Sequence, residues 1–367
     1  MWLWGFLPLA IWVYLLSGRG MFWMTRERDA DDAPEPKRWP SVVAVVPARD
    51  EADVIERAIG SLMRQDYKGE FKVILVDDQS SDGTGELVAG CTVIKGAARP
   101  PGWTGKLWAL KQGIDAAGTP DYLWLTDADI AHTPNNLAKL VARAEQGKLV
   151  LTSLMAKLHC GNPAERLLIP AFVYFFAMLY PFAWVNDPSN KLAAAAGGCM
   201  LVKRKALERA GGIDAIKSEI IDDCAFARLM KAQGPIWLGL TGRSVSLRPY
   251  SFSDIRRMVA RSAYAQLSYS PLLLIGTLIG MVLVYLAAPA AALFAQGWAQ
   301  LAGLIAWLLM AFSFAPMLRF YRVSVFVGFA MPVIGLLYAL FTLDSAIQHR
   351  RGRGGMWKGR AQAAGRA

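Results

Sequence analysis

The stretch Tyr-Leu-Trp-Leu-Thr-Asp-Ala-Asp, residues 122–129, runs from a short apolar segment into two acidic residues. An apolar segment of this length, rich in aromatic residues, is typical of a buried β-strand. Asp127 and Asp129 follow it, separated by one residue, and on a strand residues i and i+2 point to the same side. Because neighbouring carboxylates repel and are costly to desolvate, we expect a positive group beside this pair.

Similar apolar segments precede and follow this one, and helical patterns at 52–64 and 104–117 lie between them. Continuous apolar strands separated by helices indicate an α/β domain with a mostly parallel sheet covered on both faces. Ligands of open α/β sheets bind beyond the carboxyl ends of the strands, where Asp78 and the two acids of 122–129 stand. The other predicted strands are residues 41–47, 71–78, 91–94 and 148–153.

The composition indicates a membrane protein with a soluble part, because an apolar fraction of 54% is too high for an ordinary soluble domain. Residues 1–24 carry no charge before Arg19 and are followed by basic residues, which predicts an anchor whose C-terminal side faces the cytoplasm. Three later segments are long and uncharged and are predicted to span the bilayer as helices. They are residues 272–294, 298–317 and 323–343.

Residues 167–185 are also apolar and contain Pro170 and Pro181. A single crossing here would place the acidic residues that precede this segment and those that follow it on opposite sides of the membrane. We therefore favour a helix lying in the membrane interface beside the active site, with a buried core helix as the alternative. The predicted parts of the chain are an anchor at 1–24, a linker at 25–40, a catalytic domain at 41–265, three membrane segments within 266–345 and a basic tail at 346–367.

The basic residues of the tail bear on the partners and on the topology of the chain. The net charge is +11, but no nucleic-acid-reading module accompanies it, so we expect an anionic lipid surface and no nucleic acid as the partner of the tail. One anchor and three spans would place the tail outside, against the positive-inside tendency. Either one segment is re-entrant or the tail breaks the tendency, and both alternatives stay open.

The Asp-x-Asp pair has the ligand chemistry of a divalent cation site. Asp127 and Asp129 can direct both carboxylates at one ion, and hard oxygen ligands suit Mg²⁺ or Mn²⁺. Such ions usually also hold substrate phosphates. His132 is a further candidate ligand, with a histidine at the start of a helix as the alternative.

Other loops carry candidate contacts for a nucleoside diphosphate. Lys106 stands in a Gly-rich loop that opens a helix and can present a cation and backbone N–H groups to phosphate, or it is a surface lysine. Asp78 can accept from a pyrimidine and Glu51 from a base or ribose, with helix capping as the alternative for each. Asp222 and Asp223 precede a helix, whose dipole favours acids there. If Asp223 faces the metal site, it is a plausible general base.

Together these motifs resemble the inverting glycosyltransferases of family two. The matching pieces are V-P-A-R-D-E, V-D-D-Q-S-S-D-G-T, T-D-A-D, G-G-C-M-L-V-K-R and D-D-C-A-F, in the family's order over about 41–230. The resemblance implies a nucleotide-sugar-binding fold of the GT-A type, with Asp129 on the metal and Asp223 as the catalytic base. It implies nucleotide-sugar contacts at Pro47, Ala48, Glu51, Asp78, Lys106, Asp127 and Asp222, the last of which stands where the family has Glu.

The stretch G-W-T-G-K-L-W-A and the C-terminal M-W-K-G-R look like the membrane-bound branch that acts on lipids, most like the hopanoid-associated glycosyltransferases. Processive synthases carry Q-x-x-R-W after the base, and the stretch S-D-I-R-R-M-V-A-R-S-A-Y has neither the Gln nor the Trp in place. Arg257 and Arg261 in that stretch are candidates for holding the departing diphosphate, with lipid headgroups as the alternative partner.

The sequence thus predicts an enzyme of the cytoplasmic (inner) membrane, with several spans and its catalytic domain in the cytoplasm. It would move a sugar from a nucleoside-diphosphate sugar, expected to be a UDP-sugar, to the hydroxyl of a hopanoid-like, other isoprenoid or sphingolipid-like acceptor. A polyprenyl-phosphate glycosyltransferase is one alternative. A non-catalytic transport or assembly subunit is another, although uncharged spans argue against a transport pathway.

Overall fold

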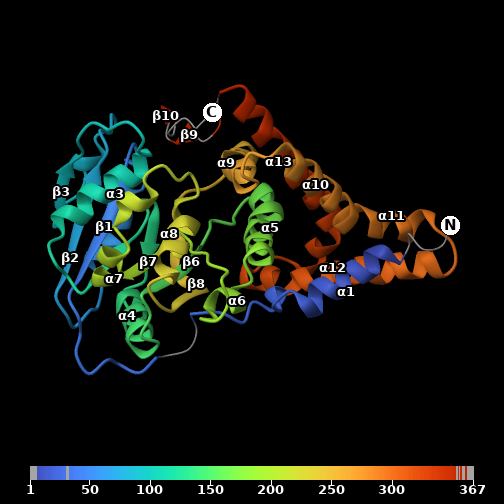
Figure 1. Ribbon diagram of the computed structural model, residues 1–367, viewed down its shortest axis with the longest axis horizontal. Helices are drawn as coiled ribbons and strands as arrows, with labels where there is room; N and C mark the ends of the chain where they lie inside the picture. Colours follow the sequence, from blue (N-terminus) through green and yellow to red (C-terminus); the bar gives the residue numbers. More distant parts are fainter. Residues whose placement is uncertain (1–5, 30–32, 353, 355, 358–359, 362–367) are drawn as a thin grey trace. The chain divides into compact units, whose positions relative to one another are not determined.

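A mixed eight-stranded sheet organises one of the two units of the chain (Figure 1). The computed structural model describes residues 6–29, 33–352, 354, 356–357 and 360–361. The sheet unit comprises Glu27–His159, Trp184–Pro249 and Met356–Ala367. Its strands are β1 (Val42–Ala48), β2 (Phe71–Asp77), β3 (Thr92–Lys95), β4 (Tyr122–Leu125), β5 (Ile130–His132), β6 (Leu151–Lys157), β7 (Met200–Lys203) and β8 (Ile236–Ser246), in the order β3-β2-β1-β4-β7-β6-β8-β5.

The direction of the strands divides the sheet into two halves. Strands β3, β2, β1 and β4 run parallel, as the alternation of strands and helices predicts. The other half is mixed, because β7 is antiparallel to both of its neighbours and β5 is antiparallel to β8, while β6 and β8 are parallel. The five predicted strands all form, and the one expected at 148–153 lies at Leu151–Lys157. The separate two-stranded sheet pairs β9 (Met356–Trp357) with β10 (Arg360–Ala361).

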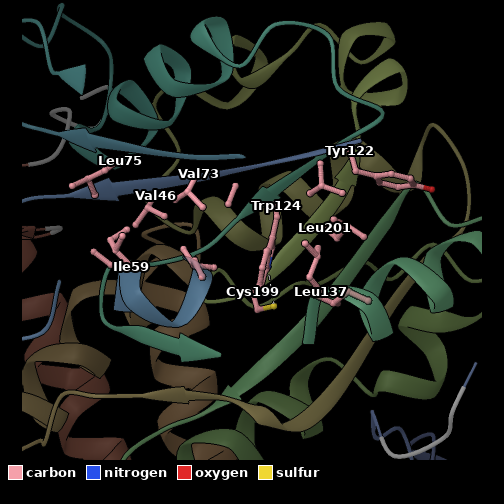
Figure 2. Packing of buried hydrophobic residues seen from close by; sticks show 14 of the residues in the cluster. Val46, Ile59, Val73, Leu75, Tyr122, Trp124, Leu137, Cys199 and Leu201 are labelled. Atoms are coloured by element: carbon pink, nitrogen blue, oxygen red, sulfur yellow. Dashed lines mark hydrogen bonds between the residues drawn. The ribbon is translucent and has the colours of Figure 1, made fainter. Parts of the chain in front are cut away.

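Helices cover both faces of the parallel half. On one face, Ile59 of α2 and Leu137 of α4 join a buried cluster with Val46 of β1 (Figure 2). On the other face α3 lies so close that a Cβ atom on its Gly113 would come within 2.4 Å of Val45 Cγ1. The helical segments of this unit are α2 (Ile55–Met63), η3 (Thr84–Glu86), α3 (Gly105–Ala116), α4 (Asn136–Gln146), α7 (Arg204–Arg209), η4 (Ile213–Ile216) and α8 (Asp222–Lys231).

The second unit is helical and comprises Met1–Arg26, Cys160–Ala183 and Tyr250–Gly355. Buried polar contacts join its helices, such as Tyr338 Oη donating to Leu168 O at 2.9 Å. Its segments are α1 (Leu7–Gly18), η2 (Phe22–Met24), α5 (Pro163–Leu179), α9 (Phe252–Gln266), α10 (Pro271–Met281), the π-helical segment η5 (Val282–Leu286), α11 (Ala287–Phe294), α12 (Trp298–Phe320), η6 (Val325–Ala330) and α13 (Met331–Arg350), while α6 (Phe182–Asn186) runs from this unit into the other.

Three helices are long and apolar enough to cross a membrane: Pro271–Phe294, Trp298–Phe320 and Val325–Arg350. They coincide with the three predicted spans, so membrane association of the chain is supported. Helix α1 has 12 residues, fewer than the roughly 20 that a straight span needs, and residues 1–5 of the predicted anchor lie outside the described residues. Residues 30–32 of the predicted linker, and residues 353, 355, 358–359 and 362–367 of the predicted basic tail, also lie outside them.

The apolar segment predicted at 167–185 is two helices separated at Pro181. Helix α5 is packed inside the helical unit, where Tyr174 is fully buried and its hydroxyl lies 2.6 Å from Ser313 Oγ. This packing matches the alternative of a core helix. The place of the segment relative to a bilayer stays a prediction.

Candidate active site

The loops after β1 and β2 are tied together by hydrogen bonds at the carboxyl end of the sheet. Asp78 N donates to Ala48 O at 2.8 Å, and Glu51 N donates to Thr84 Oγ1 at 2.8 Å. Pro47 stands beside Val76 in the parallel ladder. These contacts bring the two motifs that carry Pro47, Ala48, Glu51 and Asp78 to one edge of the sheet, as the strand-end argument predicts.

The Asp78 carboxylate is fully buried and faces an arginine. Arg49 Nη1 lies 3.9 Å from Asp78 Oδ2 and donates to the carbonyl oxygens of Asp78 and Gln79 at 2.5 and 3.1 Å. This arginine therefore fixes the start of the loop after β2. The contact between Asp78 and a nucleotide base stays a prediction.

Lys106 joins two of the predicted acidic residues. Its Nζ lies 2.8 Å from Asp127 Oδ1 and 3.2 Å from Asp222 Oδ2. The lysine comes from the first turn of α3, Asp127 follows β4, and Asp222 is the first residue of α8. Burial opposes the charged form of the lysine, but the carboxylates of Asp127, Asp222 and Asp223 outweigh it and raise its pKa. Lys106 is therefore an ammonium ion at physiological pH.

Asp129 faces a different cation, which the sequence did not reveal. The guanidinium of Arg248 forms an ion pair with the Glu51 carboxylate, and its Nε lies 3.8 Å from Asp129 Oδ2. Burial, together with the nearby charges of Asp127 and Glu51, raises the pKa of Asp129 to about 6, although Arg248 opposes the shift. The positive charge expected beside the Asp-x-Asp pair is thus supplied in part by the protein itself.

Arg248 was missed because it belongs to no recognised motif. It follows the end of β8 as a single arginine before a proline, and β8 itself was not predicted. The sequence signal is a lone cation after an apolar segment, which is too common to select one residue.

Asp223 lies in the same group as Asp127 and Lys106. Gly197 N donates to Asp223 Oδ2 at 3.3 Å, and Cys224 N donates to Oδ1 at 2.7 Å. A Cβ atom on Gly197 would lie 3.0 Å from Lys106 Nζ, 3.7 Å from Asp223 Cβ and 3.9 Å from Asp127 Oδ2. Burial, and the charge of Asp222, raise the pKa of Asp223 to about 6 against the effect of Lys106. Such a carboxylate can accept a proton near neutral pH.

The proposed metal contact of His132 is not supported by the geometry. The ring is buried, and burial lowers its pKa to about 3. Asn136 Nδ2 can only donate, so His132 Nδ1 accepts from it at 3.1 Å and Nε2 donates to Thr126 Oγ1 at 2.9 Å. The Thr126 hydroxyl donates in turn to Gly198 O at 2.8 Å. Both ring nitrogens are thus used inside the protein, and His132 holds the turn beside Gly197.

Arg257 and Arg261 lie on α9 of the helical unit, and both side chains are exposed. Arg257 forms an ion pair with Asp254 on the same helix at 2.5 Å. Their contact with a diphosphate stays a prediction.

Asp127 and Asp129 fit the ligand chemistry of Mg²⁺ or Mn²⁺. The Asp127 side chain is 34% exposed and the Asp129 side chain 20%, so both can reach an ion. The two carboxylates repel each other, and a cation between them would relieve this repulsion. Within the described part of the chain, no group of three or more His, Cys, Asp or Glu side chains could hold a metal ion. A cation here would therefore use one or two carboxylates and take its other ligands from substrate and water, as Mg²⁺ commonly does.

Comparison of the sequence with known families and proteins gives two matches over this region. The family described as Glycosyl transferase family 2 matches residues 43–211. A curated protein of Bacillus subtilis (strain 168), "Probable glycosyltransferase YdaM", is 28% identical over 228 residues, which cover 56% of this chain and 52% of that protein. The match thus spans about half the length of this relative.

Comparison of structures extends the likeness to the fold of nearly the whole chain. The mannosyltransferase PcManGT of Pyrobaculum calidifontis, solved in complex with GDP-Man and Mn²⁺, covers 94% of this chain and 99% of its own, with a TM-score of 0.56 and 20% identity. Glucosyl-3-phosphoglycerate synthase of Mycobacterium tuberculosis covers 62% of this chain and 79% of its own, with a TM-score of 0.42 and 20% identity. The sheet unit is therefore a mixed-sheet domain of the GT-A type, followed by a helical C-terminal region.

Proposed function

We propose that this chain, which carries a glycosyltransferase domain of family two, moves a sugar with inversion from a nucleoside-diphosphate sugar to the hydroxyl of a membrane lipid. One observation carries the proposal: Asp127, Lys106 and Asp223 meet around Gly197 at the carboxyl end of the sheet. A cation for phosphate and a carboxylate for an acceptor proton thus lie in one group, as a single displacement requires.

Asp223 is the general base of this reaction. Its carboxylate takes the proton of the acceptor hydroxyl, whose oxygen forms a bond with the anomeric carbon of the sugar. The bond from that carbon to the phosphate oxygen breaks, and the nucleoside diphosphate leaves with the electron pair. The pKa of about 6 keeps Asp223 mostly ionised at neutral pH, while leaving it basic enough to assist the transfer.

Lys106 and Arg248 are the cations of the donor site. Both lie beside the Asp-x-Asp pair, and each can donate to phosphate oxygens. A Mg²⁺ or Mn²⁺ ion held by Asp129 and Asp127 would neutralise further charge on the departing diphosphate. The Mn²⁺ and GDP-Man bound by the Pyrobaculum calidifontis mannosyltransferase support a metal and a sugar nucleotide here, and we keep a UDP-sugar as the proposed donor.

The acceptor is proposed to be a lipid because the chain carries three helices that could span a membrane. An enzyme held at the bilayer can meet a lipid hydroxyl at the surface without extracting the lipid. The motif resemblance of the G-W-T-G-K-L-W-A stretch favours a hopanoid-like or related acceptor at the cytoplasmic membrane, with the catalytic domain in the cytoplasm.

The proposal is tested by incubating membranes that contain the protein with radiolabelled UDP-sugars and GDP-sugars and extracting the lipids. We expect a labelled, base-stable glycolipid with the wild type and a loss of about 10²-fold or more with Asp223→Asn. Asp115→Asn, on the exposed surface of α3, is the matched control. Near-normal activity of Asp223→Asn would instead favour a polyprenyl-phosphate acceptor, which is already ionised and needs no base.

A further inference from the structure

We propose that Arg248 is the resident counter-ion of Asp129 and keeps a divalent cation from binding firmly until a nucleoside diphosphate binds with it. The inference rests on the proposed function, because it assumes a diphosphate donor. It concerns the order in which charges enter the site, and it assigns a role to a residue outside the sequence motifs.

The geometry shows two matching arrangements around the Asp-x-Asp pair. Lys106 lies between Asp127 and Asp222, at 2.8 and 3.2 Å. Arg248 in the same way lies between Asp129, at 3.8 Å, and Glu51. Each acid that could bind a metal thus already has a protein cation, and each cation is held by a second carboxylate. This second contact keeps the cation in place when no substrate is bound.

The charges of the group make the entry of metal and donor interdependent. Five carboxylates, those of Glu51, Asp127, Asp129, Asp222 and Asp223, surround the two cations Lys106 and Arg248. The group therefore has an excess of three negative charges when all are ionised. A diphosphate cannot approach this excess without added positive charge.

A divalent cation that enters alone is repelled at Asp129 by the positive charge of Arg248. It needs an oxygen of the carboxylate that faces Arg248, and the guanidinium is then left close to a second cation. A diphosphate removes this conflict, because its oxygens can accept hydrogen bonds from Arg248. Metal and nucleotide are therefore expected to increase each other's affinity, and the coupling is reciprocal.

The test is the binding of Mn²⁺ to the purified full chain, measured by the loss of the electron paramagnetic resonance signal of free Mn²⁺. Wild type and Arg248→Gln are titrated first without nucleotide, and then with UDP or GDP. We expect Arg248→Gln to bind Mn²⁺ alone about three- to fivefold more tightly, as for loss of one partly exposed ionic contact. The increase in affinity that UDP or GDP gives should be smaller in the variant than in the wild type.

Two further variants make the result specific. Arg209→Gln removes the same charge from the exposed surface of α7 and should leave both affinities unchanged. Arg248→Lys keeps the charge and should bind Mn²⁺ more like the wild type than Arg248→Gln does. Comparing these variants separates a local effect from a change in net charge or in folding.

The inference is overturned if Arg248→Gln and Arg248→Lys both bind Mn²⁺ alone no more tightly than the wild type does. This holds even if sugar transfer is observed. Nucleotide-dependent Mn²⁺ binding with the expected effect of Arg248→Gln, but with no transfer from any sugar nucleotide, would contradict the proposed function and support the counter-ion role. The two failures are therefore distinguishable.

Discussion

Lys106 Nζ lies 2.8 Å from Asp127 Oδ1, so a lysine at the start of α3 neutralises the first acid of the Asp-x-Asp pair. The same ammonium group lies 3.2 Å from Asp222 Oδ2 and lowers the pKa of the proposed base Asp223. One side chain thus links the predicted donor site to the predicted acceptor site.

Replacing Lys106 should change both the rate and the pH dependence of transfer. Lys106→Gln removes the cation that we propose faces the departing diphosphate, and we expect kcat to fall by about 10²–10³-fold. Because Lys106 lowers the pKa of Asp223, its loss raises that pKa, and the base ionises only at higher pH. The acidic limb of the pH–rate profile should therefore move from about pH 6 to higher pH. Lys111→Gln, on the same helix, is the control and should leave the profile in place.

Asp129→Asn should stabilise the fold at high pH. The pKa of Asp129 is raised to about 6 in the folded protein, from 3.8, so the ionised carboxylate is less favourable in the folded than in the unfolded state. Stability from the protonated form is complete below the unfolded pKa and is lost as pH rises through about 6. We expect the variant to be more stable by roughly 1–2 kcal/mol at pH 8 and equal to the wild type below pH 4. Melting temperatures across this range test it, and a constant difference would contradict it.

Gly197→Ala should reduce transfer more than its neighbour Gly198→Ala. A methyl group at position 197 would meet Lys106 Nζ at 3.0 Å, whereas one at 198 would have ordinary contacts, the nearest at 3.4 Å to Ala156 and Ile130. Displacing the lysine misaligns the base and the phosphate site, so we expect a fall of about tenfold or more in kcat/KM. Steady-state kinetics of both variants, with melting temperatures to confirm folding, make the comparison. Equal losses would mean that Lys106 moves aside without consequence.

His132→Ala should weaken the fold without weakening metal binding. The change removes the hydrogen bonds that Thr126, Asn136 and Ser244 make with the buried imidazole, at a cost of about 1–3 kcal/mol. Since the imidazole is not directed at the metal, the affinity for Mn²⁺ in the presence of UDP should stay within about twofold of the wild type at a temperature where both are folded. A tenfold loss of Mn²⁺ affinity would restore His132 to the metal ligands.

The parallel half of the sheet could be predicted because its strands are continuous apolar segments separated by amphipathic helices. The direction of the strands then brings Ala48, Asp78 and Asp127 to one edge. The rest depends on tertiary pairing. Strand β5 has only three residues, and β7, although as long as the predicted β3 and β4, runs antiparallel to both of its neighbours, which an alternation of strands and helices does not predict.

The candidate site also contains residues that the sequence pattern reveals and residues that only tertiary pairing brings together. Asp223 was a candidate because an acidic pair at a helix start is visible in the sequence and the resemblance implies a base at that position. Arg248 was not, since the pairing of β8 with β5, continued by the hydrogen bond from Leu247 N to Asp129 O at 2.8 Å, brings it beside Asp129. His132 stayed a candidate metal ligand in the sequence because spacing from an Asp-x-Asp pair does not reveal the direction of a ring, which packing against Trp124 and Asn136 determines.

The hydrogen bonds from Asn136 through His132 and Thr126 to Gly198 all run in one donor direction. Each side chain must therefore offer an acceptor to the one before it and a donor to the one after it. Replacing one of them would leave a buried donor or acceptor unpaired unless its neighbour changed as well. In a deep mutational scan these buried polar positions should tolerate as few substitutions as the carboxylates that would meet substrate. Attempts to change the sugar specificity of the enzyme should therefore leave Asn136, His132 and Thr126 unchanged.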